Sequence, residues 1–301
     1  MGREPSPLSP WATRCHRRPR RPALPLPPAL RAGPGFAQHP RVARHVPHFF
    51  LEEAPVGARL RLGAAEAEHA RVLRLKAGAP CVGLDGQGGR WELEVAQVAP
   101  KELLLDLRGP RQELPAPGQA GAALPWIEMA IAWPRRNRAE PMLSSLVQLG
   151  VAAIRPLEAQ HRGPQRDPNP GTGRALRRMQ EDCKQCGRAW LPVIDEALTP
   201  AALAELRAET ALAVLDPGGM AFDTWLRSLV PSLAGPGTQE RPISLAIGPE
   251  GGFDDDERAA LLEAGATRVS LGPHILRIET AAVAAASVAV TVLRTGFFKD
   301  S

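Results

Sequence analysis

The spacing of hydrophobic positions changes once along the chain. From residue 47 to about 107 the apolar runs are short and alternate with polar residues, as in Arg-Leu-Arg-Leu (59–62), which is the period of a half-buried strand. Further strands are predicted at 81–85, 90–95 and 103–107, and a helix at 64–75. These short elements predict a small β-rich barrel of about 65 residues.

From Trp126 onward, apolar strand-like runs alternate with segments of helical period. The pattern predicts strands at 126–133, 151–157, 211–215, 243–247 and 268–271, and helices at about 140–149, 173–187, 200–209, 222–230, 255–264 and 279–294. Asp254 and Glu257 have the spacing of a capping box at a helix start, and Gly265 supplies a stop signal. This alternation predicts an α/β domain whose parallel sheet is covered by helices on both faces.

Changes of composition mark the domain boundaries. Residues 1–41 contain ten prolines, eight arginines and one glutamate without a hydrophobic period, so we expect a disordered extension there. An inert extension, or a start codon placed too far upstream, explains it better than an RNA-binding arm does. A Pro- and Gly-rich linker at 109–122 leads from a first domain at 42–112 to a second at 123–298.

Composition excludes several classes of protein. The chain has 301 residues, 44% hydrophobic and 23% charged, as in ordinary soluble globular proteins of two domains. Its longest apolar stretch, 280–293, is shorter than the ~20 residues of a membrane span, and four cysteines are too few for a disulfide scaffold. The net charge is +5, but residues 1–41 carry +7 and leave −2 for the rest, so an RNA site has to be argued from local arginines.

Two Gly-Pro segments follow neighbouring predicted strands. In Ile-Gly-Pro-Glu-Gly-Gly-Phe (247–253), a buried strand runs directly into a glycine-rich loop and then a capped helix. Parallel sheets bind ligands at the carboxyl ends of their strands, and glycine lets the backbone approach a ligand closely. The segment is neither a Walker loop nor a dinucleotide fingerprint, so a ligand loop and a tight structural turn are both open interpretations.

The second segment, Leu-Gly-Pro-His-Ile-Leu-Arg-Ile-Glu-Thr (271–280), leads into the last helix. A helix start favours anions, so Arg277 is misplaced there for stability alone. The alternative is a surface pair between Arg277 and Glu279. Because two Gly-Pro loops come at the ends of adjacent strands, we expect them to share one pocket.

Other reactive side chains have weaker patterns. Arg-Arg-Asn-Arg (135–138) follows a predicted strand and could grip phosphate or a base edge, or be a solvated helix start. Cys183 and Cys186 lie late in a helix without a second cysteine pair, which disfavours a redox or zinc site and favours buried helix cysteines. His274 has no second histidine at metal spacing. We therefore expect no bound metal.

The combination of 245–253 with 271–281, in that order and spacing, closely resembles the ribosomal RNA small subunit methyltransferase E family of the SPOUT class. Segments 185–188, 191–194 and 149–151 also match, so the likeness covers roughly 43–297. It implies a SPOUT-type α/β parallel sheet with a C-terminal trefoil knot, preceded by a PUA-like RNA-binding barrel. It also implies methyl transfer from S-adenosylmethionine to N3 of one uridine in the 16S rRNA of the small ribosomal subunit, by a cytoplasmic homodimer without metal.

The resemblance also assigns residues. The implied cofactor-binding residues are Leu215, Leu245, Gly248, Pro249, Glu250, Gly251, Leu271, Gly272, Ile275, Leu276 and Thr280, with the Asp-Pro-Gly-Gly turn at 216–219 as a third wall. The implied catalytic residues are Arg277, Glu279, Arg138 and Arg188. Uridine N3 must lose its proton, which a base or cations can assist. Glu279 and Glu250 are candidate bases, and we favour arginine stabilisation with Glu279 orienting Arg277.

Several positions depart from the family pattern. Ser145 and Lys184 stand where lysine and glutamate are common, and Gln148 stands where glutamate is common. Gln-His-Arg (160–162) replaces Glu-Arg-Ser/Cys, and Pro141 lies near a predicted helix start, where the first turn tolerates it. These changes lie in the target-facing half. They leave open a catalytically weakened descendant that binds RNA or cofactor, and a SPOUT methyltransferase with a different RNA target.

Overall fold

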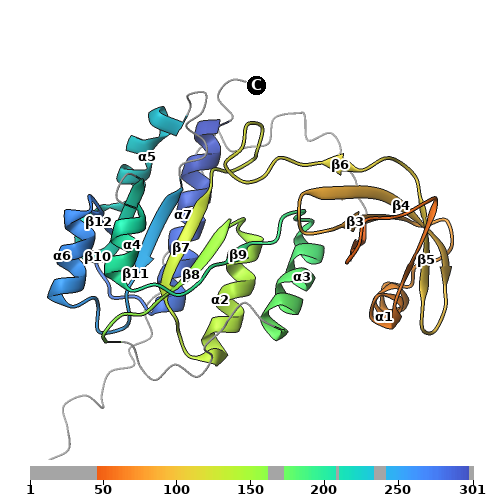
Figure 1. Ribbon diagram of the computed structural model, residues 1–301, viewed down its shortest axis with the longest axis horizontal. Coiled ribbons are helices and arrows are strands. Elements are labelled where there is room, and N and C mark those ends of the chain that lie inside the picture. The colour runs from red at the N-terminus through yellow and green to blue at the C-terminus, as the bar shows by residue number, and fades with distance from the viewer. Residues whose placement is uncertain (1–45, 162–172, 208–209, 234–241, 298–301) are drawn as a thin grey trace, which may run out of the picture. The chain divides into compact units, whose positions relative to one another are not determined.

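The structure is a computed structural model that describes residues 46–161, 173–207, 210–233 and 242–297. The extension predicted at 1–41 lies outside the described residues. All described residues belong to one compact unit, Val46–Ser301, which contains two β-sheets (Figure 1).

The first sheet contains the short strands of the amino-terminal half. Its strands are β1 (His48–Phe50), β2 (Arg59–Leu62), β3 (Pro80–Leu84), β4 (Gly89–Val98), β5 (Leu103–Leu107) and β6 (Gln112–Glu113), in the order β1-β3-β4-β5-β2 with β6 beside β4. Only β1 runs parallel to its neighbour. Among the described strands no pairing joins β1 to β2, so closure into a barrel remains a prediction.

Helix α1 (Ala64–Val72) packs against β4 and β5 of the first sheet. It places Ala67 and Ala70 in a core with Phe49 and Trp91. The helix ends three residues before the predicted Leu75 because Arg74 has a positive φ of 55°, which interrupts a right-handed helix.

The second sheet is parallel throughout, as the alternating pattern predicts. Its strands are β7 (Ile127–Ala132), β8 (Ala153–Leu157), β9 (Val193–Ile194), β10 (Ala211–Ala221), β11 (Ile243–Ile247) and β12 (Thr267–Ser270), in the order β12-β10-β11-β7-β8-β9. The turn predicted at 216–219 lies inside β10, where the register with β12 shifts between Leu215 and Met220. The two-residue strand β9 is too short for its hydrophobic period to be seen.

Helices cover both faces of this sheet (Figure 1). They are α2 (Arg136–Gln148), α3 (Arg174–Cys186), α4 (Pro200–Arg207), α5 (Phe222–Leu233), α6 (Asp255–Glu263) and α7 (Ile278–Phe297). On one face α2 packs between α3 and α7, and α7 also contacts α5; on the other face α4 packs against α6. None of the described helices is long and apolar enough to cross a membrane.

Helix α2 begins one turn earlier than predicted. Pro141 therefore lies in its second turn rather than in the first, where proline is tolerated, and it removes one backbone hydrogen bond from the helix. The prediction for α6 is confirmed: Asp254 and Glu257 form a capping box.

Candidate functional site

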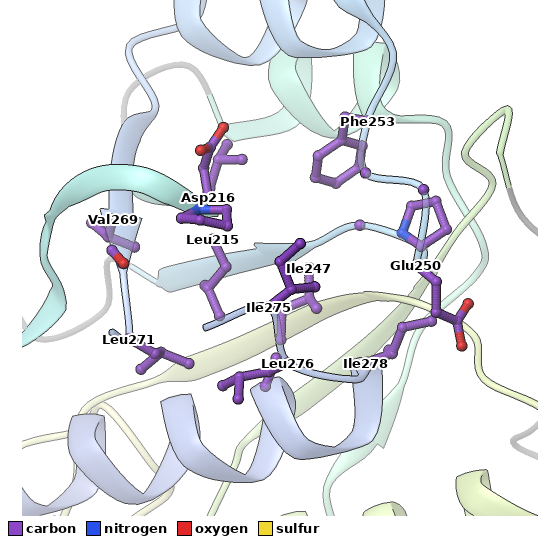
Figure 2. Close-up of a pocket in the computed structure, with 18 of the residues that line it drawn as sticks. Leu215, Asp216, Ile247, Glu250, Phe253, Val269, Leu271, Ile275, Leu276 and Ile278 are labelled. Carbon is purple, nitrogen blue, oxygen red and sulfur yellow. The ribbon is translucent and has the colours of Figure 1, made fainter. Parts of the chain in front are cut away.

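A pocket of about 260 Å³ lies at the carboxyl ends of β11 and β12, beside the irregular middle of β10. The loops after β11 and β12 and the irregular part of β10 form its walls, so the two Gly-Pro segments do meet. In Figure 2 the aliphatic side chains of Leu215, Ile247 and Leu276 lie between two carboxylates, those of Asp216 and Glu250, at opposite ends of the view. An apolar centre with a few polar groups is typical of a small-molecule site.

The loop after β11 is held by a tight turn. The Gly252 amide donates to the Pro249 carbonyl at 2.8 Å, and Gly252 has a φ of +76°, a conformation that glycine adopts without strain. The capping box of α6 follows directly: Asp254 accepts from the Glu257 amide at 2.7 Å. The loop is therefore fixed at both ends, and Glu250 lies at its tip with its side chain 60% exposed.

Asp216 anchors the third wall. Its carboxylate accepts from Arg268 at 3.0 Å and from the Gly218 amide at 2.9 Å, and it lies 3.6 Å from Arg258 of α6. Burial alone would raise the pKa of Asp216, but these donors outweigh it and hold the pKa below its ordinary value. Asp216 therefore links β10 to β12 and to α6 through charged contacts.

The pocket lining contains the predicted cofactor-binding residues except two. Leu245 is fully buried in the core cluster of the sheet, and Thr280 is exposed on α7 and does not line the pocket. Sequence reasoning missed Phe253, Arg258 and Ile278, which do line it. Phe253 and Ile278 lie directly beside the Gly-Pro loops in the sequence, and Arg258 lies on α6. These positions were the signal by which the three residues could have been found.

Two of the predicted catalytic residues meet beside the pocket. Arg138 of α2 lies 3.6 Å from a carboxylate oxygen of Glu279 on α7 and 3.6 Å from one of Glu250. Arg277 is exposed, and no ion pair or side-chain hydrogen bond joins it to another described residue. The expectation that Glu279 orients Arg277 is therefore wrong for this structure, because the packing of α2 against α7 gives Glu279 a different arginine.

Arg188 has a structural role at the end of α2. Its guanidinium donates to the Val147 carbonyl in the last turn of α2 at 2.9 Å and to the Val151 carbonyl just beyond that helix at 2.7 Å, so it satisfies acceptors at the helix end. It does not line the pocket. The structure therefore does not bring this predicted catalytic residue to the other three.

The two helix cysteines differ in exposure. Cys183 is buried, as expected, and burial raises the pKa of its thiol to about 12. Cys186 is exposed, contrary to the expectation, although partial burial of its thiol still raises the pKa of that group. Thiols with raised pKa values are poor nucleophiles. Among the described residues, no group of three or more metal-binding side chains forms a site.

The fold and the pocket together define the class of the protein. It has an α/β domain with a pocket at the edge of a parallel sheet, and residues 122–290 match the RNA methyltransferase domain family. The chain belongs to that family, and it is similar to proteins named ribosomal RNA small subunit methyltransferase E. It is similar to a protein of that name from Synechocystis, with 32% identity over 70% of this chain and 65% of the relative. A Mycobacterium bovis protein of the same name is 32% identical over 54% of this chain and 61% of its own length. The chain thus spans less than two thirds of either relative.

Solved structures show the same fold. A probable rRNA methyltransferase from Porphyromonas gingivalis has a TM-score of 0.64 at 26% identity, covering 82% of this chain and 98% of that one. A methyltransferase from Legionella pneumophila, solved with S-adenosylmethionine, has a TM-score of 0.64 at 24% identity, covering 81% and 96%. The α/β fold with a parallel sheet is therefore that of SPOUT methyltransferases.

Proposed function

We propose that the chain transfers a methyl group from S-adenosylmethionine to N3 of a uridine in 16S rRNA of the small ribosomal subunit. The observation that carries this proposal is the meeting of both Gly-Pro loops and β10 around one pocket in a member of this family. The resemblance adds a homodimer in the cytoplasm, a trefoil knot in 123–298 and a PUA-like domain in 42–112.

The lining suits this cofactor. Leu215, Ile247 and Leu276 give an apolar bed for a planar base, and the backbone near the glycines can approach it closely. Glu250 places a carboxylate at one end, which favours a positively charged ligand. When bound, S-adenosylmethionine supplies an electrophilic methyl group on a sulfonium centre.

The arginines beside the pocket suit the target base. As N3 loses its proton, negative charge develops on the uracil ring, and fixed cations in a partly dry site stabilise such charge. Arg138 is held by Glu250 and Glu279. Arg277 is exposed without a partner among the described residues, so its guanidinium is available to the uracil ring. Glu250 is the more accessible candidate base, because one oxygen of Glu279 is fully buried.

The experiment uses small ribosomal subunits that lack this modification and methyl-labelled S-adenosylmethionine. We expect labelled N3-methyluridine at one position of the digested 16S rRNA, measured by mass spectrometry. The Arg277→Ala variant should bind cofactor and keep its fold but lose transfer. Cofactor binding without label would overturn the proposal in favour of a binding-only descendant, and label in tRNA or 23S rRNA alone would indicate a different target.

A further inference from the structure

Cations in the described chain divide into paired and unpaired side chains. In the first sheet, Arg59, Arg61, Arg108 and Arg111 each lie within ion-pair distance of a carboxylate. Beside the second sheet, Arg135, Arg177 and Arg277 are exposed and have no ion pair or side-chain hydrogen bond to another described residue. We name these three the arginine row. Their positive charge is thus not neutralised within the described part of the protein.

The arginine row lies along one edge of the second sheet. Arg135 directly precedes α2, Arg177 belongs to the first turns of α3, and Arg277 directly precedes α7. These helices follow strands of one parallel sheet, and α2 packs between the other two. All three arginines therefore lie at the strand carboxyl ends, the edge that also holds the pocket.

Helix stability does not explain these positions. A positive side chain at a helix start is unfavourable, since the helix dipole is positive there. Neither α2 nor α3 has an acidic residue in its first turn, whereas α6, at the same edge, begins with Asp254, Asp255, Asp256 and Glu257. The fold thus allows acidic helix starts at this edge. The starts of α2 and α3 depart from them, whereas α7 has Glu279 in its first turn beside Arg277.

We infer that Arg135 and Arg177 of the arginine row bind the phosphate backbone of the target RNA and lead it across the starts of α3 and α2 to Arg277 and the pocket. The inference rests on the proposed function and adds the surface that holds the substrate. Exposed arginines on rigid elements position a nucleic acid through its phosphates, independently of sequence. The paired arginines of the first sheet, by contrast, should contribute little to this attraction.

The test compares Arg135→Gln/Arg177→Gln with a matched control, Arg227→Gln/Arg294→Gln. The control also removes two exposed arginines of the second domain, Arg227 of α5 and Arg294 at the far end of α7. Binding to small subunits and to protein-free 16S rRNA is measured over a range of salt concentrations, and S-adenosylmethionine binding by calorimetry.

We expect the arginine-row variant to lose about tenfold in affinity for both RNA substrates. Its dependence of log affinity on log salt should become shallower by about one to two units, since each lost phosphate contact contributes ~0.7–0.9. Cofactor binding should be unchanged, and the control variant should behave like wild type.

Wild-type affinity in the arginine-row variant, or an equal loss in the control, would overturn the inference. Loss on subunits but not on protein-free rRNA would also overturn it, because the partner would then be an acidic protein surface. A wild type that binds rRNA through these arginines yet forms no N3-methyluridine would contradict only the proposed reaction.

Discussion

Arg138 lies 3.6 Å from a carboxylate oxygen of Glu279, which links the first turn of α2 to the first turn of α7. Another nitrogen of the same guanidinium lies 3.6 Å from Glu250 in the pocket loop. Both distances fit ion pairs but are too long for direct hydrogen bonds. The second oxygen of Glu279 is buried without a hydrogen-bond partner in the described chain. One cation thus serves two carboxylates from two different elements.

We therefore expect Arg138→Ala to lower the rate of methyl transfer by about 10²–10³, the loss typical of a fixed electrostatic group at a reacting centre. The variant also leaves Glu250 and Glu279 without their shared cation, so the affinity for S-adenosylmethionine should change less than kcat. Steady-state kinetics on small subunits and circular dichroism check both points. Arg227→Ala removes an exposed arginine of α5 and should have no effect. Wild-type kcat in Arg138→Ala would contradict the assignment.

Gly219 of β10 lies directly against the backbone of β12. A Cβ atom at this position would lie 2.4 Å from the Val269 amide nitrogen and 2.5 Å from the Arg268 carbonyl carbon. These are backbone atoms, so Gly219→Ala has to move the pocket wall, and we expect a Tm lowered by several degrees and weaker S-adenosylmethionine binding. Gly109→Ala, whose added Cβ would meet no atom closer than 4.0 Å, is the control. Equal Tm and affinity in the two variants would show that the close approach is unimportant.

The loops that form this site can be predicted from the sequence, whereas the contacts that its side chains make cannot. The pocket follows from local signals, since Gly-Pro segments after two successive parallel strands come to the same sheet edge, here on either side of β10. The partners of Glu279 and Arg188 depend on how α2 packs against α7 and where α2 ends, and no local pattern encodes those contacts. The short strands β6 and β9 were missed for a related reason, because two residues are too few to show a hydrophobic period.

Lys184 departs from the family pattern, and two glutamates balance its positive charge. It is only 4% exposed, and its Nζ lies 2.7 Å from Glu66 of α1 and 2.7 Å from Glu181. Lys184→Glu would place three carboxylates together, so we expect the free energy of unfolding to fall by about 3–5 kcal/mol, as for a broken buried pair. In urea unfolding, the charge-swapped Lys184→Glu/Glu66→Lys protein should recover a large part of the lost free energy of unfolding. A swap that recovers nothing would mean that the pair does not stabilise the fold.

Glu128 is the most buried charge of the second sheet. It is fully buried on β7, and it accepts hydrogen bonds from Arg155 at 2.9 Å, Arg207 at 2.7 Å and Ser244 at 2.5 Å. Burial alone would raise the pKa of Glu128, but the three donors outweigh it and lower the pKa. Removing the charge leaves the half-buried Arg207 without its carboxylate partner and leaves the buried Arg155 with Asp195 alone, so Glu128→Gln should lower the free energy of unfolding at pH 7 by about 3–5 kcal/mol.

The lowered pKa of Glu128 also fixes how this difference depends on pH. A carboxyl whose folded pKa lies below its unfolded value of about 4.3 contributes its full stability above that value. The contribution is lost as the pH falls through the lowered folded pKa. Urea unfolding of wild type and Glu128→Gln should therefore differ most near pH 7, stay different down to about pH 4, and converge below it. Other carboxylates affect both proteins equally and cancel in the difference. A difference that stays constant to pH 3 would mean that packing, not the charge of Glu128, accounts for the loss.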